Sequence, residues 1–181
     1  MDLLRSSVEL DVLPAGVDVY LVEERANPST DYFVHPACAG QGRRLHRCLF
    51  DDPPPEVSLA NAVVVFVRYI PPLWRRKVQA ERTGMAQLVF FMDDDVLDPA
   101  AWDDMPWRYR YKLYRQAARH AGWLQKVDAQ LWVSTAWLQK KYAAWSPCGW
   151  SRGRCRARRA RAASSITAAP RIAPRSAGCV R

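Results

Sequence analysis

The sequence predicts an α/β domain with a doubly wound, mainly parallel β-sheet and helices on both faces. Three observations lead to this fold class. The apolar runs at 62–67 and 88–92 do not alternate with polar residues, which is typical of strands buried on both faces. Stretches with helical spacing follow these runs, and turn residues separate the two kinds of segment. Because strands that alternate with helices are joined by right-handed crossovers, we expect one Rossmann-like domain.

Charge is distributed unevenly along the 181 residues. Nine of the 27 Lys and Arg residues, and none of the 18 Asp and Glu residues, lie in 148–181, so 1–147 carries 18 of each sign. The net charge of +9 is therefore no argument that the folded part binds nucleic acid, and no nucleic-acid partner is expected. We predict an N-terminal extension at 1–16, the domain at 17–147 and a disordered tail at 148–181.

The first half of the domain begins with a strand at 17–22. Residues 27–31 supply caps for a helix that ends at Gly40 and Gly42. An alternating strand at 44–50 is expected near an edge of the sheet, and the proline-rich loop 51–55 follows it. The buried strand at 62–69 leads into a helix that begins at Pro71 and Pro72, runs to about Thr83 and is capped by Gly84.

The second half begins with the buried strand at 87–92, and a short turn or helix at 98–102 follows. The longest helix is expected to start at Pro106. Its apolar positions recur every three or four residues, which predicts one buried face: Trp107, Tyr111, Tyr114, Ala118, Ala121 and Leu124. A strand at 129–134 and a helix at 137–145, capped by Ser134 or Thr135, complete the domain.

Three carboxylates, Asp93, Asp94 and Asp95, directly follow the strand at 87–92. A charged carboxylate is costly to bury without a partner, so these side chains must emerge where the strand ends. In open α/β sheets the carboxyl edge is where ligands bind. Other polar residues follow the neighbouring strands and are expected at the same edge: Glu23, Glu24, Arg25, Arg68, Tyr69 and Ser134.

No glycine-rich fingerprint follows the first strand and no phosphate-binding loop is present, which disfavours a dinucleotide-binding domain. Four stretches taken together resemble the N-terminal half of bacterial two-domain glycosyltransferases of the GT-B fold. They are VEERANPSTDYF at 22–33, VVFVRY at 64–69, FMDDDVLD at 91–98 and LWVST at 131–135. The resemblance covers about 17–147.

The resemblance implies transfer of a sugar from a nucleotide-sugar to an acceptor, in a cleft between two Rossmann-like halves. The N-terminal half faces the acceptor, and the C-terminal half, which this chain lacks, grips the donor. We therefore expect the chain alone to be inactive, since positioning both substrates supplies much of the rate enhancement. No resident cofactor and no divalent metal are implied. From their places at the strand ends and in the turn that follows, the candidate catalytic residues are Asp93, Asp94, Asp95 and Glu24, and the candidate substrate-binding residues are Arg25, Arg68, Tyr69, Trp102 and Ser134.

Several of these residues have more than one interpretation. The aspartates could orient or deprotonate an acceptor hydroxyl, hold Mg²⁺ or Mn²⁺ as an Asp-x-Asp pair, or cap the following turn. A Glu–Arg pair after the first strand could fix the loop rather than act in catalysis. Arg68 could bind phosphate, but we favour a pair with the aspartates. Trp102, in the connecting turn, is a candidate for stacking on a sugar, whereas Trp107 and Tyr111 are expected in the core.

Residues 1–13 mix Asp2, Arg5, Glu9 and Asp11 with apolar residues, so no signal peptide is visible, and no apolar run approaches the ~20 residues of a membrane span. The five cysteines show no metal-ligand spacing. We expect a cytoplasmic protein with reduced thiols. The basic face of the longest helix is compatible with peripheral contact with anionic lipid.

The tail lacks Leu, Phe, Tyr, Asp, Glu and Lys, and is dominated by Arg, Ala, Ser, Gly, Pro and Cys. A basic disordered arm is one interpretation. Translation out of frame is another, and we favour it. Read one base earlier, the codons from Ser164 to Arg181 permit Phe-Tyr-His-Gly-Ser-Ala-Ser-His-Arg-Ala-Glu-Ile-Arg-Trp-Leu-Arg, whose start is similar to that of the donor-binding half of GT-B enzymes. We expect the gene, read in that frame after Pro147, to encode an apolar-patterned domain.

Two other functions remain open. The first is a non-enzymatic Rossmann-like binding module with a basic arm that binds nucleic acid; salt-sensitive DNA binding that disappears with 148–181 would favour it. The second is a metal-dependent transferase of the GT-A type; saturable Mn²⁺ binding that depends on Asp93 and Asp95 would favour that.

Overall fold

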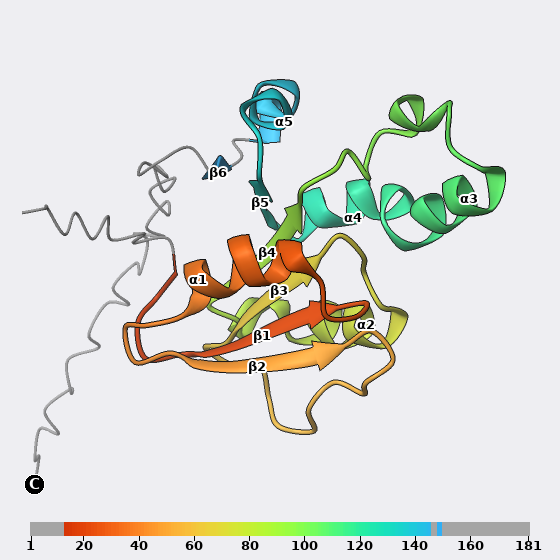
Figure 1. Ribbon diagram of the computed structural model, residues 1–181. Coiled ribbons are helices and arrows are strands. Elements are labelled where there is room, and N and C mark those ends of the chain that lie inside the picture. Colours follow the sequence, from red (N-terminus) through yellow and green to blue (C-terminus); the bar gives the residue numbers. More distant parts are fainter. Residues whose placement is uncertain (1–12, 146–147, 150–181) are drawn as a thin grey trace, which may run out of the picture.

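The computed structural model describes residues 13–145 and 148–149, which form one α/β domain (Figure 1). All strands are parallel, in the order β2-β1-β3-β4-β5-β6. Their bounds are β1 Asp18–Glu23, β2 Arg44–Leu49, β3 Val63–Val67, β4 Gln87–Met92, β5 Gln130–Val133 and β6 Cys148–Gly149. The predicted fold class is confirmed, and β2 lies at an edge as expected.

The strand order contains one reversal of direction. The chain moves from β1 to β2 on one side, then returns to place β3 on the other side of β1, and adds β4 to β6 beyond it. In doubly wound sheets the crevice outside the strand ends at such a reversal is the preferred ligand site. This switch point lies between β1 and β3.

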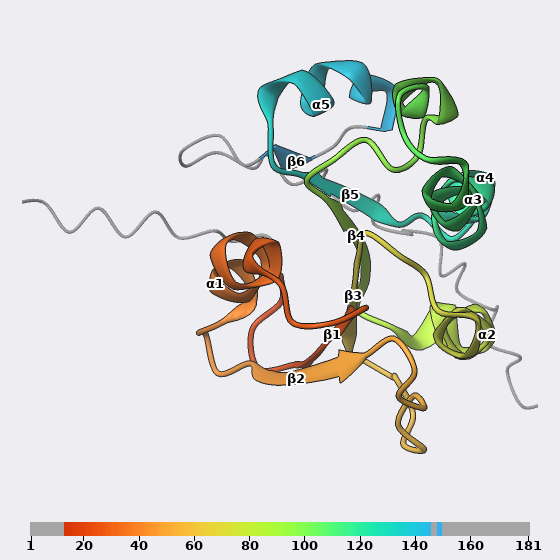
Figure 2. The same cartoon turned by 45° about the vertical axis from the view of Figure 1, so that its right-hand side comes forward.

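Helices cover both faces of the sheet. The turn η1 (Thr30–Val34) and helix α1 (His35–Cys38) lie on one face, and α2 (Pro72–Glu81), α3 (Trp107–Gln116) and α4 (Ala121–Lys126) lie on the other (Figure 2). The remaining elements are short helical turns and one helix beside β5: η2 Arg82–Gly84, η3 Pro99–Trp102, η4 Ala118–His120, α5 Ala136–Lys141 and η5 Ala143–Trp145.

The uninterrupted apolar runs follow from burial on both faces. Val63, Val65 and Val67 of β3 pack in the core on the α1 side, and Val64 and Phe66 pack on the other side. All five residues are buried. Because each face needs its own apolar side chains, the strand cannot alternate with polar residues.

The predicted long helix is broken, and this corrects the expectation that Trp107 and Tyr111 are in the core. The α3 helix ends at Gln116, whose carbonyl accepts a hydrogen bond from Ile70 N–H at 2.8 Å instead of from the next helical turn. The break at Ala117 turns the chain, so the positions before and after it do not share one face. Trp107 is 71% exposed and Tyr111 56% exposed, whereas Leu113 is buried.

The domain extends slightly beyond the predicted boundaries. Leu13, in the predicted extension, is buried in the α1-side core, and β6 pairs with β5 beyond position 147. Apart from Cys148 and Gly149, which form β6, the residues of the predicted disordered or frameshifted tail lie outside the described part of the chain. In the described ranges, no helix is long and apolar enough to cross a membrane. Cys38 and Cys48 are free thiols, and burial raises the pKa of Cys38 to about 12.

Candidate functional site

Three side chains from different segments meet where β4 ends. Asp93 follows β4, Arg68 follows β3, and Ser29 lies in the helical segment directly before η1. The Ser29 hydroxyl donates to Asp93 Oδ2, and Arg68 Nε lies 2.9 Å from Asp93 Oδ1. Arg68 also pairs with Asp94, so the expected pairing of this arginine with the aspartates is confirmed. We call Ser29, Arg68, Asp93 and Asp94 the edge cluster.

Arg68 holds an unusual backbone conformation at the end of β3. Its φ is +65°, in the left-handed region that non-glycine residues rarely adopt, while its N–H donates to Phe91 O at 2.8 Å. Such strained residues persist where the surroundings over-determine them, and they concentrate at functional sites. Burial lowers the pKa of Arg68, but the charges of Asp93 and Asp94 outweigh this effect and raise the pKa above its usual value.

Asp95 belongs to a different network and is structural. Its side chain is 6% exposed, and its two oxygens accept from Tyr142 Oη at 2.5 Å and Lys141 Nζ at 2.6 Å. Lys141 also reaches Asp98 Oδ2 at 2.5 Å, and these two carboxylates raise the pKa of Lys141. Since these bonds tie α5 to the loop after β4, we interpret Asp95 as an anchor, which disfavours its predicted catalytic role.

Trp102 is enclosed by the protein, which disfavours the prediction that it stacks on a ligand. The side chain is 2% exposed, and its indole N–H donates to the Asp95 carbonyl at 2.7 Å. The short turn η3 is capped by Asp98, which accepts from Ala100 N–H at 3.0 Å. This turn folds back on the core, so its aromatic residue is enclosed.

The residues after β1 divide between burial and solvent. Glu23 accepts from Arg47 Nε at 2.8 Å and from Asn27 Nδ2 at 3.1 Å, and its burial removes it from contact with a substrate. A Glu–Arg pair, which was one of the two alternatives for these residues, is therefore present, but its arginine is Arg47 of β2 and not the adjacent Arg25. Glu24 is half-buried, and Arg25 is exposed.

Glu24 pairs with Lys112 of α3 at 2.5 Å, and this lysine lies over the Tyr69 ring, 4.9 Å from its centroid. Tyr69 is buried; burial first, and then its hydrogen bond with Tyr109, raises its pKa well above the usual value. Tyr69 thus stays protonated, and the lysine lies over its ring.

Ser134, at the end of β5, also contacts the edge cluster. Its Oγ donates to the Asp93 carbonyl at 3.3 Å and so helps to hold the backbone of Asp93 in place.

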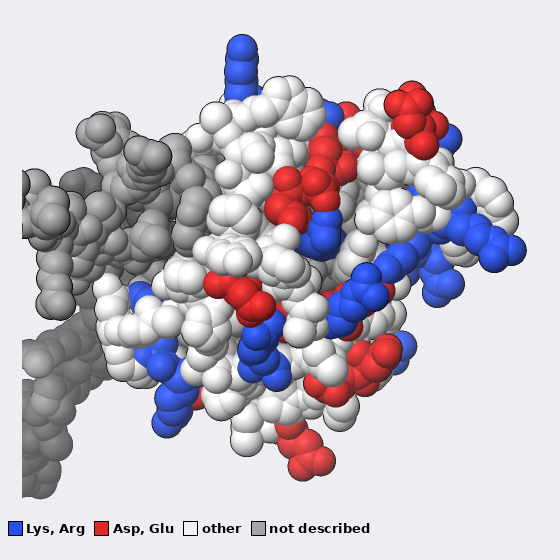
Figure 3. Space-filling view, viewed as in Figure 1, with Lys and Arg blue, Asp and Glu red and all other residues white. Residues whose placement is uncertain are grey.

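Acidic and basic side chains lie next to one another on the face of the molecule that Figure 3 shows. Asp93 and Asp95 turn to different partners, which disfavours the Asp-x-Asp metal pair. The described residues contain no group of three His, Cys, Asp or Glu side chains placed to hold a metal ion.

No family model, curated protein or solved structure matches the chain. Any functional conclusion must therefore rest on the residues themselves. The resemblance noted in the sequence stays an expectation.

The structure brings together Asp93, Asp94 and Arg68 of the predicted site residues, with Ser134 behind them. Ser29 was expected as a helix cap in preference to a ligand-binding residue, yet Asn27 performs the capping role by accepting from Thr30 N–H at 3.0 Å. Ser29 and Asp93 are 64 positions apart in the chain, so their pairing could not be predicted from sequence spacing. Lys112 was expected on the basic face of the long helix, in contact with solvent or with anionic lipid, and its pair with Glu24 was not predicted.

Proposed function

We propose that this domain is the acceptor-binding half of a two-domain glycosyltransferase. The observation that carries the proposal is the edge cluster: a carboxylate pair held by an arginine and a serine at the carboxyl edge of a parallel sheet, close to its switch point. Carboxylates at such an edge bind hydroxyl groups, which are what a sugar acceptor presents.

Asp94 is the better candidate for direct contact with the acceptor. Asp93 already accepts hydrogen bonds from Ser29 and, at 3.2 Å, from Asp94 N–H, and it forms an ion pair with Arg68, so both of its oxygens are engaged. The side chain of Asp94 is 66% exposed and pairs only with Arg68 among the described residues. In this proposal Asp93 and Arg68 hold Asp94 in place, and Asp94 accepts a hydrogen bond from the hydroxyl that receives the sugar.

Donor binding is assigned to a second half, in keeping with the resemblance. Without it, the acceptor hydroxyl can be bound but has no activated sugar within reach, so the chain alone is expected to bind and not to transfer. The proposal predicts that the gene, read one base earlier after Pro147, encodes that half. A stop codon soon after the junction in that frame would remove this part of the proposal.

Saccharide binding tests the acceptor-side role directly. A panel of mono- and disaccharides and of nucleotide-sugars is titrated against the full chain and followed by ligand-observed NMR. We expect at least one saccharide to bind and nucleotide-sugars not to bind. Asp94→Asn should weaken saccharide binding about tenfold, the value of one hydrogen bond to a charged group. The exposed Asp104→Asn is the matched control, and equal affinities of both variants would contradict the proposal.

In a chain that carries the in-frame second half, transfer itself can be measured as release of the nucleoside diphosphate. There, Asp94→Asn should lower kcat by about 10²–10⁴-fold if the carboxylate takes the acceptor's proton, and by less if it only orients the hydroxyl. An unchanged kcat and KM would refute a role in either step.

A further inference from the structure

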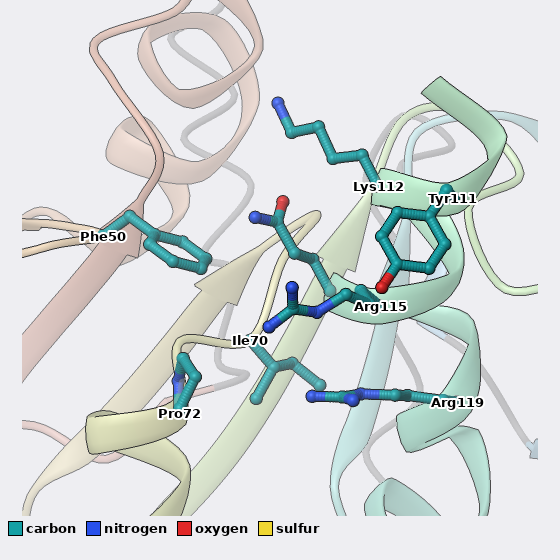
Figure 4. A pocket seen from close by; sticks show the side chains of 8 residues that line it. Phe50, Ile70, Pro72, Tyr111, Lys112, Arg115 and Arg119 are labelled. Atoms are coloured by element: carbon teal, nitrogen blue, oxygen red, sulfur yellow. The ribbon is translucent and has the colours of Figure 1, made fainter. Parts of the chain in front are cut away.

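A separate cavity of about 270 Å³ opens between α3 and the segment that joins β3 to α2 (Figure 4). Its walls are apolar on one side and basic on the other, lined by Phe50, Ile70, Pro72, Tyr111, Lys112, Arg115, Gln116 and Arg119. None of these side chains is acidic. The volume lies below the roughly 300–1,000 Å³ of sites for drug-sized ligands, so the occupant must be compact.

Two arginines in this cavity lack a counter-charge. Arg115 and Arg119 extend from the α3 side toward Ile70 and Pro72, and within the described part of the chain neither forms an ion pair with an acid (Figure 4). Lys112 points away from them and pairs instead with Glu24. Like charges so close together repel each other, and an anion between them would turn this repulsion into attraction.

A neutral histidine fixes one of these arginines. Arg119 Nε donates to His120 Nε2 at 3.2 Å, which leaves the two terminal nitrogens of the guanidinium for a ligand. A guanidinium fork oriented in this way matches two oxygens of a phosphate. Gln116 also lines this cavity, and its Oε1 atom is buried without a hydrogen-bond partner among the described atoms.

We propose that this cavity binds a compact phosphomonoester whose apolar part packs on Phe50, Ile70 and Pro72. The phosphate lies between the Arg115 and Arg119 guanidinium groups, and Tyr111 covers one side. The site is distinct from the edge cluster, and it does not depend on the proposed glycosyl transfer.

Phenyl phosphate is the probe, and it is titrated into the full chain by calorimetry at low salt. Inorganic phosphate and benzyl alcohol are titrated separately, because they represent its charged and its apolar part. We expect phenyl phosphate to bind more tightly than either half. The variant R115Q/R119Q should lose at least tenfold in affinity, because hydrogen bonds to charged groups are each worth roughly that factor. The matched control is R76Q/R108Q, which removes two exposed arginines outside the cavity.

All variants keep the nine arginines of 148–181, so any binding there is common to them and cancels in the comparison. Circular dichroism and thermal unfolding check that the variants fold; if the double variant does not, R115Q alone is compared with R108Q. Equal affinities of the cavity and control variants, or equal binding of phenyl phosphate and inorganic phosphate, would overturn the proposal.

Vesicles distinguish the two sources of a phosphomonoester. Phosphatidylcholine vesicles with and without phosphatidic acid are sedimented with the wild-type chain and with R115Q/R119Q. Binding that needs phosphatidic acid and both arginines assigns the site to a lipid headgroup. Binding of phenyl phosphate without such vesicle binding assigns it to a soluble ligand. Failure of both measurements refutes the site and leaves the saccharide experiment at Asp94 unaffected.

Discussion

His120 should make the stability of this domain depend on pH between about 6.5 and 4. The ring is buried, 6% exposed, and it accepts from Arg119 Nε while it is bonded to the backbone of Arg115. Burial, followed by the positive charges of Arg119 and Arg75, lowers the pKa of His120 to about 4. The folded protein therefore keeps this histidine neutral in a range where the unfolded chain protonates it.

The direction of the effect follows from which state binds the proton. Above about pH 6.5 both states are neutral and the full stability is present. As the pH falls toward 4, only the unfolded state gains a proton, so the free energy of unfolding decreases. The difference between about 4 and 6.5 sets a ceiling of roughly 3 kcal/mol, and solvent screening near the exposed Arg119 reduces the expected loss to about 1–2 kcal/mol.

Urea unfolding followed by circular dichroism, at pH values from 7 to 4, measures this loss. The variant His120→Gln keeps a donor and an acceptor in a similar place but does not titrate, so its curve should be flatter than that of the wild type by the stated amount. His35→Gln, at an exposed histidine, is the control and should leave the curve unchanged. Carboxylates that titrate in this range contribute equally to all three proteins. Parallel curves for the wild type and His120→Gln would refute the reasoning.

Three further predictions concern stability and are checked by urea unfolding at pH 7. Arg47→Met leaves the buried Glu23 carboxylate without its cation and should cost about 3 kcal/mol, most of which the double variant with Glu23→Gln restores; a single-variant cost below about 1 kcal/mol would contradict this. Arg68→Gly should be more stable than Arg68→Ala by about 1 kcal/mol, since only glycine is unstrained at a φ of +65°, and equal stabilities would argue against strain. Trp102→Ala should cost about 3–5 kcal/mol and Trp107→Ala less than about 0.5 kcal/mol; a reversed order would restore the sequence-based assignment.

The fold could be predicted because its signals are local. The apolar runs of β3 and β4 report burial on both faces, and each is bounded by turn residues within a few positions. Their order along the chain, with helices between them, then fixes a parallel sheet. The same local reasoning failed for α3, because the helix ends at Gln116 through a hydrogen bond from Ile70, 46 positions earlier in the chain. The spacing of apolar residues within 106–124 cannot predict a hydrogen bond from a residue outside that stretch.

The sequence predicts where the site lies but not which side chains form it. In a parallel sheet, the polar residues that follow the strands lie at one edge. Asp93 and Arg68 indeed meet there. Which of three consecutive aspartates faces the edge depends on how the backbone turns after Met92 and on where α5 packs. The turn places Asp95 beside Lys141, and this ion pair depends on tertiary contacts rather than on the spacing of residues in the sequence. Adjacent carboxylates with the same local signal therefore acquire different roles.

The cavity and the sheet edge are connected through one ion pair, and this makes a final prediction. Lys112 contributes to the cavity wall yet pairs with Glu24, and both side chains are about one-third exposed. Such a pair is worth about 0.5–1 kcal/mol, so neutralising the acid should release the lysine to an incoming anion. Glu24→Gln should therefore raise the affinity for phenyl phosphate about two- to fivefold, measured by calorimetry at low salt, while Asp104→Asn leaves it unchanged.

Because coupling between two sites is reciprocal, a bound anion would in turn draw Lys112 away and leave Glu24 free at the edge where the acceptor is proposed to bind. An affinity unchanged in Glu24→Gln would show that Lys112 takes no part in anion binding and that the two sites are independent.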